Sequence, residues 1–458
     1  GAPMEKSVPA PPPARGRGGI GIVRLSGREA FSIGEKVFRG VSGRALSQMK
    51  GYTAQLGAAF DAAGERLDDV VALVFRAPKS YTGEDVVELS CHGGLYVTKR
   101  LLQAVLDAGA SPAGPGEFTR RAFVNGKLDL AQAEAVMGLI GASGEQARRA
   151  AEAGSTGVLS RRIAAIRGEL LEQASHLAAW ADFPEEDVPE VEEQELLAAI
   201  RRGEEELSSL LAGFERGRAY REGLETVIAG RPNAGKSTLM NLLSGCERSI
   251  VTQYAGTTRD VVEETVLLAG VPLRLADTAG LRDTDDPVES IGVQAAKKRL
   301  ETAQLVLAVF DSSQALEKED WELMEALQNV PSIAIINKTD LPTAIDGEAV
   351  RSHFEKTVAL SAASGEGLED LEQALSEILD TKEFHPEEGV LFTQRQRGDA
   401  QAALDSLREG EQALALGLTL DAVTVCVEGA LHALSALTGE QVSEEIVDRV
   451  FEEFCVGK

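Results

Sequence analysis

Gly230-Arg-Pro-Asn-Ala-Gly-Lys-Ser237 is the stretch that decides the fold of this 458-residue chain. It matches G-x-x-x-x-G-K-[ST], a glycine-rich loop whose backbone N–H groups converge on phosphate oxygens. The apolar residues 224–229 before it read as a buried strand, and residues 237–243 after it read as a helix. A strand, this loop and a helix in succession predict a nucleotide-binding fold built on a parallel-rich sheet.

Each part of the loop has a predicted contact with a triphosphate and its Mg²⁺. Lys236 can reach the β- and γ-phosphates, and Ser237 can offer its hydroxyl to Mg²⁺. The helix that follows adds the positive end of its dipole. The predicted phosphate-contacting residues are Asn233, Ala234, Gly235, Lys236, Ser237 and Thr238.

Two more motifs each follow an apolar run and complete a guanine-nucleotide pattern. Asp277-Thr-Ala-Gly280 follows residues 271–276, and a carboxylate at a strand end can hold Mg²⁺ or its water. Asn337-Lys-Thr-Asp340 follows residues 332–336. An Asp can accept hydrogen bonds from guanine N1–H and the 2-amino group, which adenine lacks, so it selects GTP over ATP.

The third motif is expected to surround the base together with a final loop. Lys338 would lie across the base, and Ser361-Ala362 after the apolar residues 357–360 suits a last base-contacting loop. Each motif alone could be an ordinary turn, but in this order they predict GTP binding and hydrolysis. The predicted GTP-binding residues here are Asp277, Thr278, Ala279, Gly280, Asn337, Lys338, Asp340, Ser361 and Ala362.

One residue departs from the best-known small GTPases. They place a glutamine directly after the second motif, where it orients the attacking water. This chain has Leu281, which cannot hydrogen-bond water. Another group must therefore position the water and neutralise the developing charge.

Length and composition bound the remaining possibilities. A chain of 458 residues with 43% hydrophobic residues predicts two to four globular domains. No apolar run of about 18 residues is evident, so we expect no membrane span. Four scattered cysteines without a C-x-x-C pair predict a reducing cytoplasm and no structural zinc site.

The net charge of −27 disfavours generic nucleic-acid binding. Any RNA contact would have to use local basic clusters, although a solvated helix face is the alternative interpretation of each. The clusters are Arg120-Arg121 with Lys127, Arg148-Arg149, Arg161-Arg162, and Arg395 with Arg397.

The pattern along the chain predicts a multidomain α/β fold. Residues 1–125 look α+β, and residues 126–220 turn helical, with Leu130, Ala133, Val136, Leu139 and Ile140 expected on one buried face. Residues 221–380 alternate strand and helix as a Ras-like P-loop domain should, and residues 381–458 are helical again. We predict one helical domain made of two segments, with the GTPase domain inserted between them.

Further motifs give the chain a resemblance to the MnmE (TrmE) family of tRNA-modification GTPases over nearly its whole length. Residues 16–24, 80–88 and Cys91-His-Gly-Gly94 look like the family's N-terminal folate and dimerisation domain. Residues 115–119 and 125–134 resemble the passage into its helical domain, and Phe454-Cys-Val-Gly-Lys458 is similar to its C-terminal C-x-G-K. The GTPase motifs alone also fit Era-like GTPases of ribosome assembly.

The resemblance implies that K⁺-dependent dimerisation of the GTPase domains replaces the missing glutamine. Lys236 and Asn233 would act in catalysis with Glu289, which would orient water; an exposed loop acid is the alternative for Glu289. A cation held near the β–γ bridge would do the work of an arginine finger. The implied metal ligands are Asn233, Thr252, Tyr254 and Thr257 for K⁺, and Thr258 beside Ser237 for Mg²⁺.

The resemblance also implies cofactors and partners. A 5-formyltetrahydrofolate-type cofactor would be held by Arg24, Glu88, Lys127 and Lys458, although Glu88 could be an ordinary strand residue, and Cys455 is a possible tRNA-modification residue. The protein would be a cytoplasmic homodimer that joins an FAD protein of the MnmG/GidA family as a heterotetramer. The pair would add an aminomethyl or carboxymethylaminomethyl group to C5 of the wobble uridine of certain tRNAs.

The N-terminus departs from the family pattern. Residues 5–14 are rich in proline where the family usually has an apolar β-like segment. Because proline removes a donor from the hydrogen-bond ladder, the first strand should be short or lie at a sheet edge.

Overall fold

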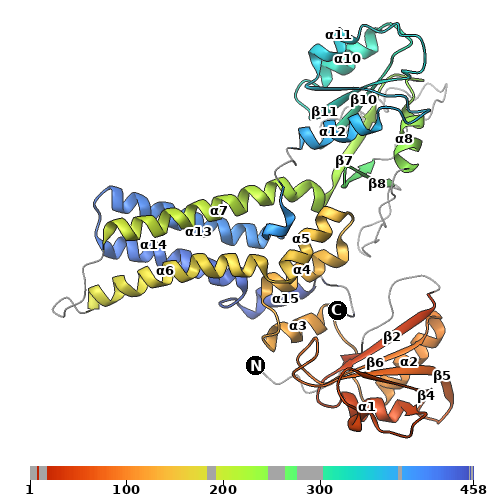
Figure 1. Ribbon diagram of the computed structural model, residues 1–458, viewed down its shortest axis with the longest axis vertical. Helices are drawn as coiled ribbons and strands as arrows, with labels where there is room; N and C mark the ends of the chain where they lie inside the picture. Colours follow the sequence, from red (N-terminus) through yellow and green to blue (C-terminus); the bar gives the residue numbers. More distant parts are fainter. Residues whose placement is uncertain are drawn as a thin grey trace. The chain divides into compact units, whose positions relative to one another are not determined.

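The computed structural model describes residues 8–9, 18–182, 192–245, 264–275, 303–379, 384–452, 454 and 457. The chain falls into two compact units, which are Gly1–Met137 with Leu431–Lys458, and Gly138–Ala430. Helices and two separate sheets make up the two units (Figure 1), so the predicted multidomain α/β class is confirmed.

The first unit is built on an antiparallel sheet with strand order β1-β2-β6-β5-β4-β3. Its strands are β1 (Val8–Pro9), β2 (Ile20–Ser26), β3 (Phe38–Gly40), β4 (Thr53–Phe60), β5 (Arg66–Phe75) and β6 (Val86–His92). Helices α1 (Ala30–Val37) and α2 (Leu95–Asp107) pack on this sheet around a core that includes Val23, Leu89 and Leu101. In β2, inward Val23 and Leu25 alternate with Ile22 and Arg24, as expected of a sheet with one covered face.

The proline-rich N-terminus does form a short edge strand, as predicted. β1 is two residues long and pairs with β2 at one end of the sheet order. Pro9 lies opposite Leu25, a position that an edge strand tolerates because one of its sides needs no ladder bonds.

Helices from both ends of the chain complete the first unit. They are α3 (Glu117–Val124), the first part of α4 (Leu130–Gly141) and α15 (Glu444–Glu452). Leu130, Phe451 and Phe454 share a buried cluster. The predicted buried face of α4 is partly wrong, because Leu139 is 39% exposed. The apolar pattern of α4 runs most of the way around the helix, so periodicity did not single out its covered side.

Long helices form the first part of the second unit. They are α5 (Glu145–Ser155), α6 (Val158–Asp182), α7 (Glu193–Glu222), α13 (Gln394–Ala415) and the start of α14 (Leu420–Thr438). α7 lies beside both α6 and α13 (Figure 1), so segments on either side of the GTPase motifs pack together.

By length and composition, α14 is long and apolar enough to cross a bilayer, although Asp421 and Glu428 interrupt its apolar residues. Its Val423, Val427 and Ala430 are fully buried at helical spacing. A core helix of a soluble protein passes the same test, so the observation is weak evidence for a membrane.

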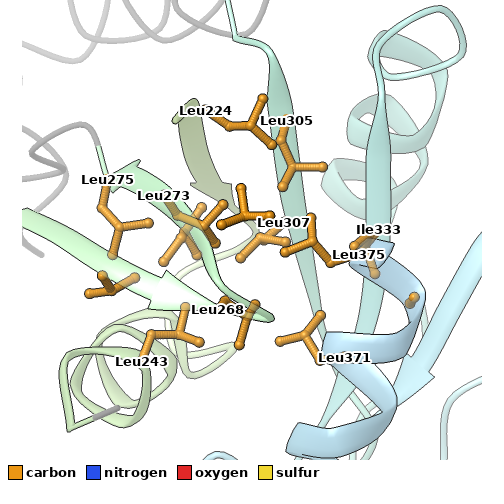
Figure 2. Close-up of a cluster of buried hydrophobic side chains, with 14 of the residues drawn as sticks. Leu224, Leu243, Leu268, Leu273, Leu275, Leu305, Leu307, Ile333, Leu371 and Leu375 are labelled. Atoms are coloured by element: carbon orange, nitrogen blue, oxygen red, sulfur yellow. The ribbon is translucent and has the colours of Figure 1, made fainter. Parts of the chain in front are cut away.

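The second sheet has strand order β12-β11-β10-β7-β9-β8, with every pair parallel except β8–β9. Its strands are β7 (Leu224–Ala229), β8 (Glu264–Leu268), β9 (Val271–Leu275), β10 (Leu305–Asp311), β11 (Ser332–Asn337) and β12 (Lys356–Ala359). The helices between them are α8 (Lys236–Gly245), α10 (Lys318–Ala326), α11 (Gly347–His353) and α12 (Leu368–Ile378). Figure 2 shows Leu243 of α8, Leu371 and Leu375 of α12, and Leu307 of β10 meeting in one apolar core.

Aromatic rings join the two points where the chain enters and leaves this sheet region. Tyr220, near the end of α7, stacks on Phe384 with ring centroids 5.3 Å apart. The Arg221 guanidinium lies 4.3 Å from the centroid of the Phe214 ring and donates to the Phe214 carbonyl. Burial lowers the pKa of Arg221 to about 10.

Candidate functional site

The glycine-rich loop connects the carboxyl end of β7 to the start of α8. A Cβ on Gly230 would lie 2.4 Å from the Val309 carbonyl oxygen, so the loop leaves β7 tightly against β10. Gly235 has φ +97°, and a Cβ there would lie 2.2 Å from Asn337 Nδ2. Both positions therefore require glycine, and together they leave a backbone cradle of the kind that holds phosphates.

The lysine of the loop reaches back across it. Lys236 Nζ donates to the carbonyls of Gly230 at 2.9 Å and of Arg231 at 2.7 Å, which holds the ammonium over the cradle. Asn233 has φ +62° and is exposed. Ser237 and Thr238 are exposed in the first turn of α8.

A single buried side chain joins this loop to the two predicted base loops. Asn337 is 2% exposed; its Nδ2 donates to the Ala234 carbonyl, and its Oδ1 accepts from the Ala362 N–H, both at 2.9 Å. Asp340 Oδ1 accepts from the Ser361 hydroxyl at 2.7 Å. The structure thus brings the described members of the predicted GTP site together at the carboxyl ends of the parallel strands, where ligands of such sheets bind.

Sequence reasoning missed Asp311, the last residue of β10. Asp311 Oδ2 lies 2.6 Å from Lys338 Nζ, and the Asp311 side chain is 3% exposed. Burial by itself would raise the pKa of Asp311, but hydrogen bonds from Lys338 and Ser313 lower it overall, so the carboxylate stays charged. The sequence did contain a sign of this residue, because Asp311 directly follows the apolar run 305–310, as Asp277 and Asn337 follow theirs.

Sequence reasoning also missed the partners of Arg231. Its guanidinium is 2.6 Å from Glu317 and 3.0 Å from Asp320, which is buried in the first turn of α10. These ion pairs raise the pKa of Arg231. They tie the outer part of the glycine-rich loop to the segment that follows β10.

Much of the predicted catalytic machinery lies outside the described residues. These positions are Thr252, Tyr254, Thr257, Thr258, Asp277, Thr278, Ala279, Gly280 and Glu289, together with Cys455 and Lys458 at the C-terminus.

The predicted folate residues that are described lie in the first unit. Arg24 of β2 and Glu88 of β6 are directly opposite in register and form an ion pair with Nε and Oε1 2.7 Å apart. The Arg24 guanidinium also lies 5.5 Å from the centroid of the Phe118 ring. Lys127 Nζ donates to the Pro78 carbonyl at 3.1 Å, beside the loop that links β5 to β6.

A second predicted feature, the basic clusters, is largely neutralised by carboxylates of the same chain. This pairing favours the interpretation of these clusters as solvated helix faces. The pairs are Arg120 with Asp448, Arg121 with Glu84 and Glu117, Arg148 with Glu145 and Glu152, Arg149 with Glu387, Arg162 with Glu206, Arg395 with Asp399, and Arg397 with Glu215.

Two family models match the chain. The model described as the MnmE helical domain matches residues 130–455, and the one described as the GTP-binding protein TrmE N-terminus matches residues 8–127.

Full-length relatives agree with these matches. A tRNA modification GTPase MnmE of Symbiobacterium thermophilum is 44% identical, and the alignment covers 99% of this chain and 100% of the relative. Proteins with the same name from Alkaliphilus oremlandii (40% identical, 99% of this chain, 100% of the relative) and Lactococcus lactis (43% identical, 97% and 96%) are similar over comparable lengths.

Proposed function

Because the chain belongs to the MnmE family of tRNA modification GTPases, we propose that it hydrolyses GTP with K⁺ stimulation and dimerisation-dependent activation. The protein is a GTP hydrolase that acts in tRNA modification. The observation that carries the proposal is the connection made by Asn337, which holds the phosphate loop and the base loop in one site.

The cation would take over part of the role of the glutamine, which is replaced by Leu281 in this chain. Asn233 is an exposed residue of the phosphate loop, and its side-chain amide oxygen is the proposed first ligand of the cation. A K⁺ bound there would supply the positive charge that stabilises the β–γ bridge oxygen. Thr252, Tyr254 and Thr257 are its other proposed ligands, Ser237 and Thr258 are the proposed Mg²⁺ ligands, and Glu289 is the proposed water-orienting residue.

The test is GTP hydrolysis in matched KCl and NaCl buffers. We expect a faster rate in K⁺, and we expect Asn233→Ala to abolish this difference between the two salts. Equal rates in the two salts for the wild-type protein would rule out the cation mechanism.

We further propose that the first unit binds a reduced folate. Arg24 and Glu88 present a donor and an acceptor side by side, which suits the alternating donor and acceptor edge of a pterin. Lys127, with Lys458 from the C-terminus, would meet the carboxylates of the glutamate tail. The folate would supply the one-carbon unit when bound; the residues of this chain would bind and orient it.

Calorimetric titration with 5-formyltetrahydrofolate tests this part separately from GTP hydrolysis. Glu88→Gln keeps the shape of the side chain but removes its charge, so we expect affinity to fall by about tenfold or more. Unchanged affinity in Glu88→Gln would remove Glu88 from the site.

The proposed domain bounds follow the family pattern. The domains would be 1–125 for folate binding and dimerisation, 126–220 and 381–458 for the helical domain, and 221–380 for the GTPase domain.

We also propose the partners and the substrate. A homodimer in the cytoplasm would join an MnmG/GidA-type FAD protein to modify C5 of the wobble uridine in tRNA, with Cys455 near the modification chemistry. Loss of the modified nucleoside from the tRNA of cells lacking this protein, detected by mass spectrometry, is the expected result.

An Era-like switch in ribosome assembly is not favoured. Such a protein needs an RNA-binding module rich in unpaired Lys and Arg, whereas the candidate basic clusters here are mostly paired within the chain. The full-length relatives are named tRNA modification GTPases, and the model of the TrmE N-terminus matches residues 8–127 of this chain.

A further inference from the structure

The carboxyl end of β10 places an acid beside the base loop. Asp311 is paired in register with Asn337, the first residue of the third motif, on the neighbouring parallel strand. All seven residues of β10 are buried, so the position of the Asp311 carboxylate is set by the packed sheet. An exposed loop residue would not have a position defined in this way.

The carboxylate is fixed from two sides. Its Oδ1 accepts from the Ser313 N–H at 2.9 Å and from the Ser313 hydroxyl at 2.6 Å. Its Oδ2 accepts from Lys338 Nζ at 2.6 Å. The carboxylate therefore has one oxygen held by its own loop and the other directed at the lysine.

Ser312, the residue after Asp311, holds the backbone of the base loop. Ser312 N–H donates to the Asn337 carbonyl, and the Ser312 hydroxyl donates to the Lys338 carbonyl, both at 2.8 Å. Lys338 has φ +64°, a conformation that costs energy for a residue with a side chain and persists only where neighbours enforce it. Ser312 provides such enforcement for the backbone, as Asp311 does for the ammonium.

The lysine stem passes close to the phosphate loop. A Cβ on Gly235 would lie 3.9 Å from Lys338 Cε, so the methylene chain runs from the base loop past Gly235 to Asp311. The Lys338 side chain is 30% exposed, so it is not closed off from solvent.

We propose that Asp311 is a positioning residue for guanine recognition, which fixes the Lys338 ammonium so that its methylene stem forms a flat wall for the base. The inference rests on the GTP-binding function of this site. A free lysine has several rotatable bonds and would lose their freedom on binding the base. An ammonium already held by Asp311 has lost that freedom before GTP arrives, so less affinity is spent on ordering it.

Three variants test the proposal in the full-length protein: Asp311→Asn, Lys338→Met and the double variant. Methionine keeps an apolar stem without the ammonium. We expect each single variant to weaken mant-GDP binding and raise KM for GTP by about tenfold, with kcat at saturating GTP within about twofold, because the phosphates are untouched. The double variant should be no weaker than either single one, since the two residues act as one unit.

A matched control removes a similar ion pair at the other end of the sheet. Lys356 Nζ and Glu377 Oε2 are 2.7 Å apart where β12 begins, remote from the carboxyl ends of the strands. Glu377→Gln should leave nucleotide affinity unchanged. This control separates a local effect on the base from a general loss of charge pairing.

Two outcomes would overturn the proposal. In the first, Asp311→Asn lowers thermal stability but leaves mant-GDP affinity unchanged in the folded protein, which would make the pair purely structural. In the second, the losses in the two single variants multiply in the double variant, which would show that Asp311 does not act through Lys338. If the wild-type protein failed to bind mant-GDP, the GTPase function itself would be wrong, which is a distinguishable result.

Discussion

Replacing Asn337 by alanine should destabilise the GTPase domain through the loss of hydrogen bonds to two backbone groups in buried residues. The side chain satisfies the Ala234 carbonyl and the Ala362 N–H, and both alanines are buried, at 3% and 6% exposure. A buried donor or acceptor left without a partner costs about 1–3 kcal/mol. The two groups together predict a loss of about 2–6 kcal/mol in the free energy of unfolding.

The chain offers a probe that reports on this domain alone. It has two tryptophans, Trp180 and Trp321, of which Trp321 lies in α10 of the GTPase domain. In a Trp180→Phe background, Trp321 fluorescence during urea titration follows that domain without assuming that the whole chain unfolds in one step. With a denaturant slope of about 2 kcal/mol/M, the midpoint should fall by about 1–3 M.

Thr339→Ala is the matched control, because Thr339 belongs to the same motif but its side chain is exposed. Its midpoint should stay close to that of the parent. If Asn337→Ala shifted the midpoint no more than Thr339→Ala, the idea that Asn337 alone satisfies the two buried groups would be refuted. Binding of mant-GDP should fall in parallel, since the phosphate loop and base loop lose their common anchor.

Three further outcomes are expected. Asp340→Asn should weaken GTP binding by about 100-fold or more and favour xanthine nucleotides in competition assays, because an amide can donate to a carbonyl where guanine has its amino group. Gly230→Ala should lower GTPase-domain stability and GTP affinity, whereas Gly245→Ala, where a Cβ meets nothing within 4 Å, should change neither. A hydrogen bond to the Asp68 carboxylate and the charge of that carboxylate raise the pKa of His92. Stability from this pair is therefore present below the ordinary pKa of histidine, while Asp68 is ionised, and is lost as pH rises through the folded-state pKa of His92. By NMR titration, Asp68→Asn should return that pKa toward its ordinary value.

Local sequence patterns predicted the elements that carry the nucleotide site. The runs 224–229 and 332–336 became β7 and β11 because continuous apolar segments between turn residues suit strands buried on both faces. The site lies at the carboxyl ends of these strands, where the motifs themselves end. The motifs follow β7 and β11, which both pair with β10, so the strand order of the sheet brings the predicted motifs to the same edge.

Other features depend on contacts that sequence patterns do not contain. The sequence gives no clear strand pattern for β4, because its alanines and glycine have low strand propensity, and β4 forms through pairing with β3 and β5 on either side. The role of Asp311 depends on Lys338, which is brought beside it only by the parallel register of β10 and β11. The buried Arg231 pair likewise joins a loop to a helix that is distant in sequence.

The hydrogen bonds around the base loop limit which residues can make the protein respond differently to GDP and GTP. Asn337, Asp311 and Ser312 hold the base-binding half of the site through bonds that involve no phosphate. A contact that is the same with GDP and GTP cannot shift an equilibrium between two states, however strong it is. The difference between the two nucleotides must therefore come from groups that respond to the γ-phosphate. We propose Thr258, through its Mg²⁺, and the backbone N–H of Gly280 for this role. Substitutions of Asn337, Asp311 or Ser312 should then weaken GDP and GTP binding by the same factor. Substitutions of Thr258 or Gly280 should weaken GTP binding alone.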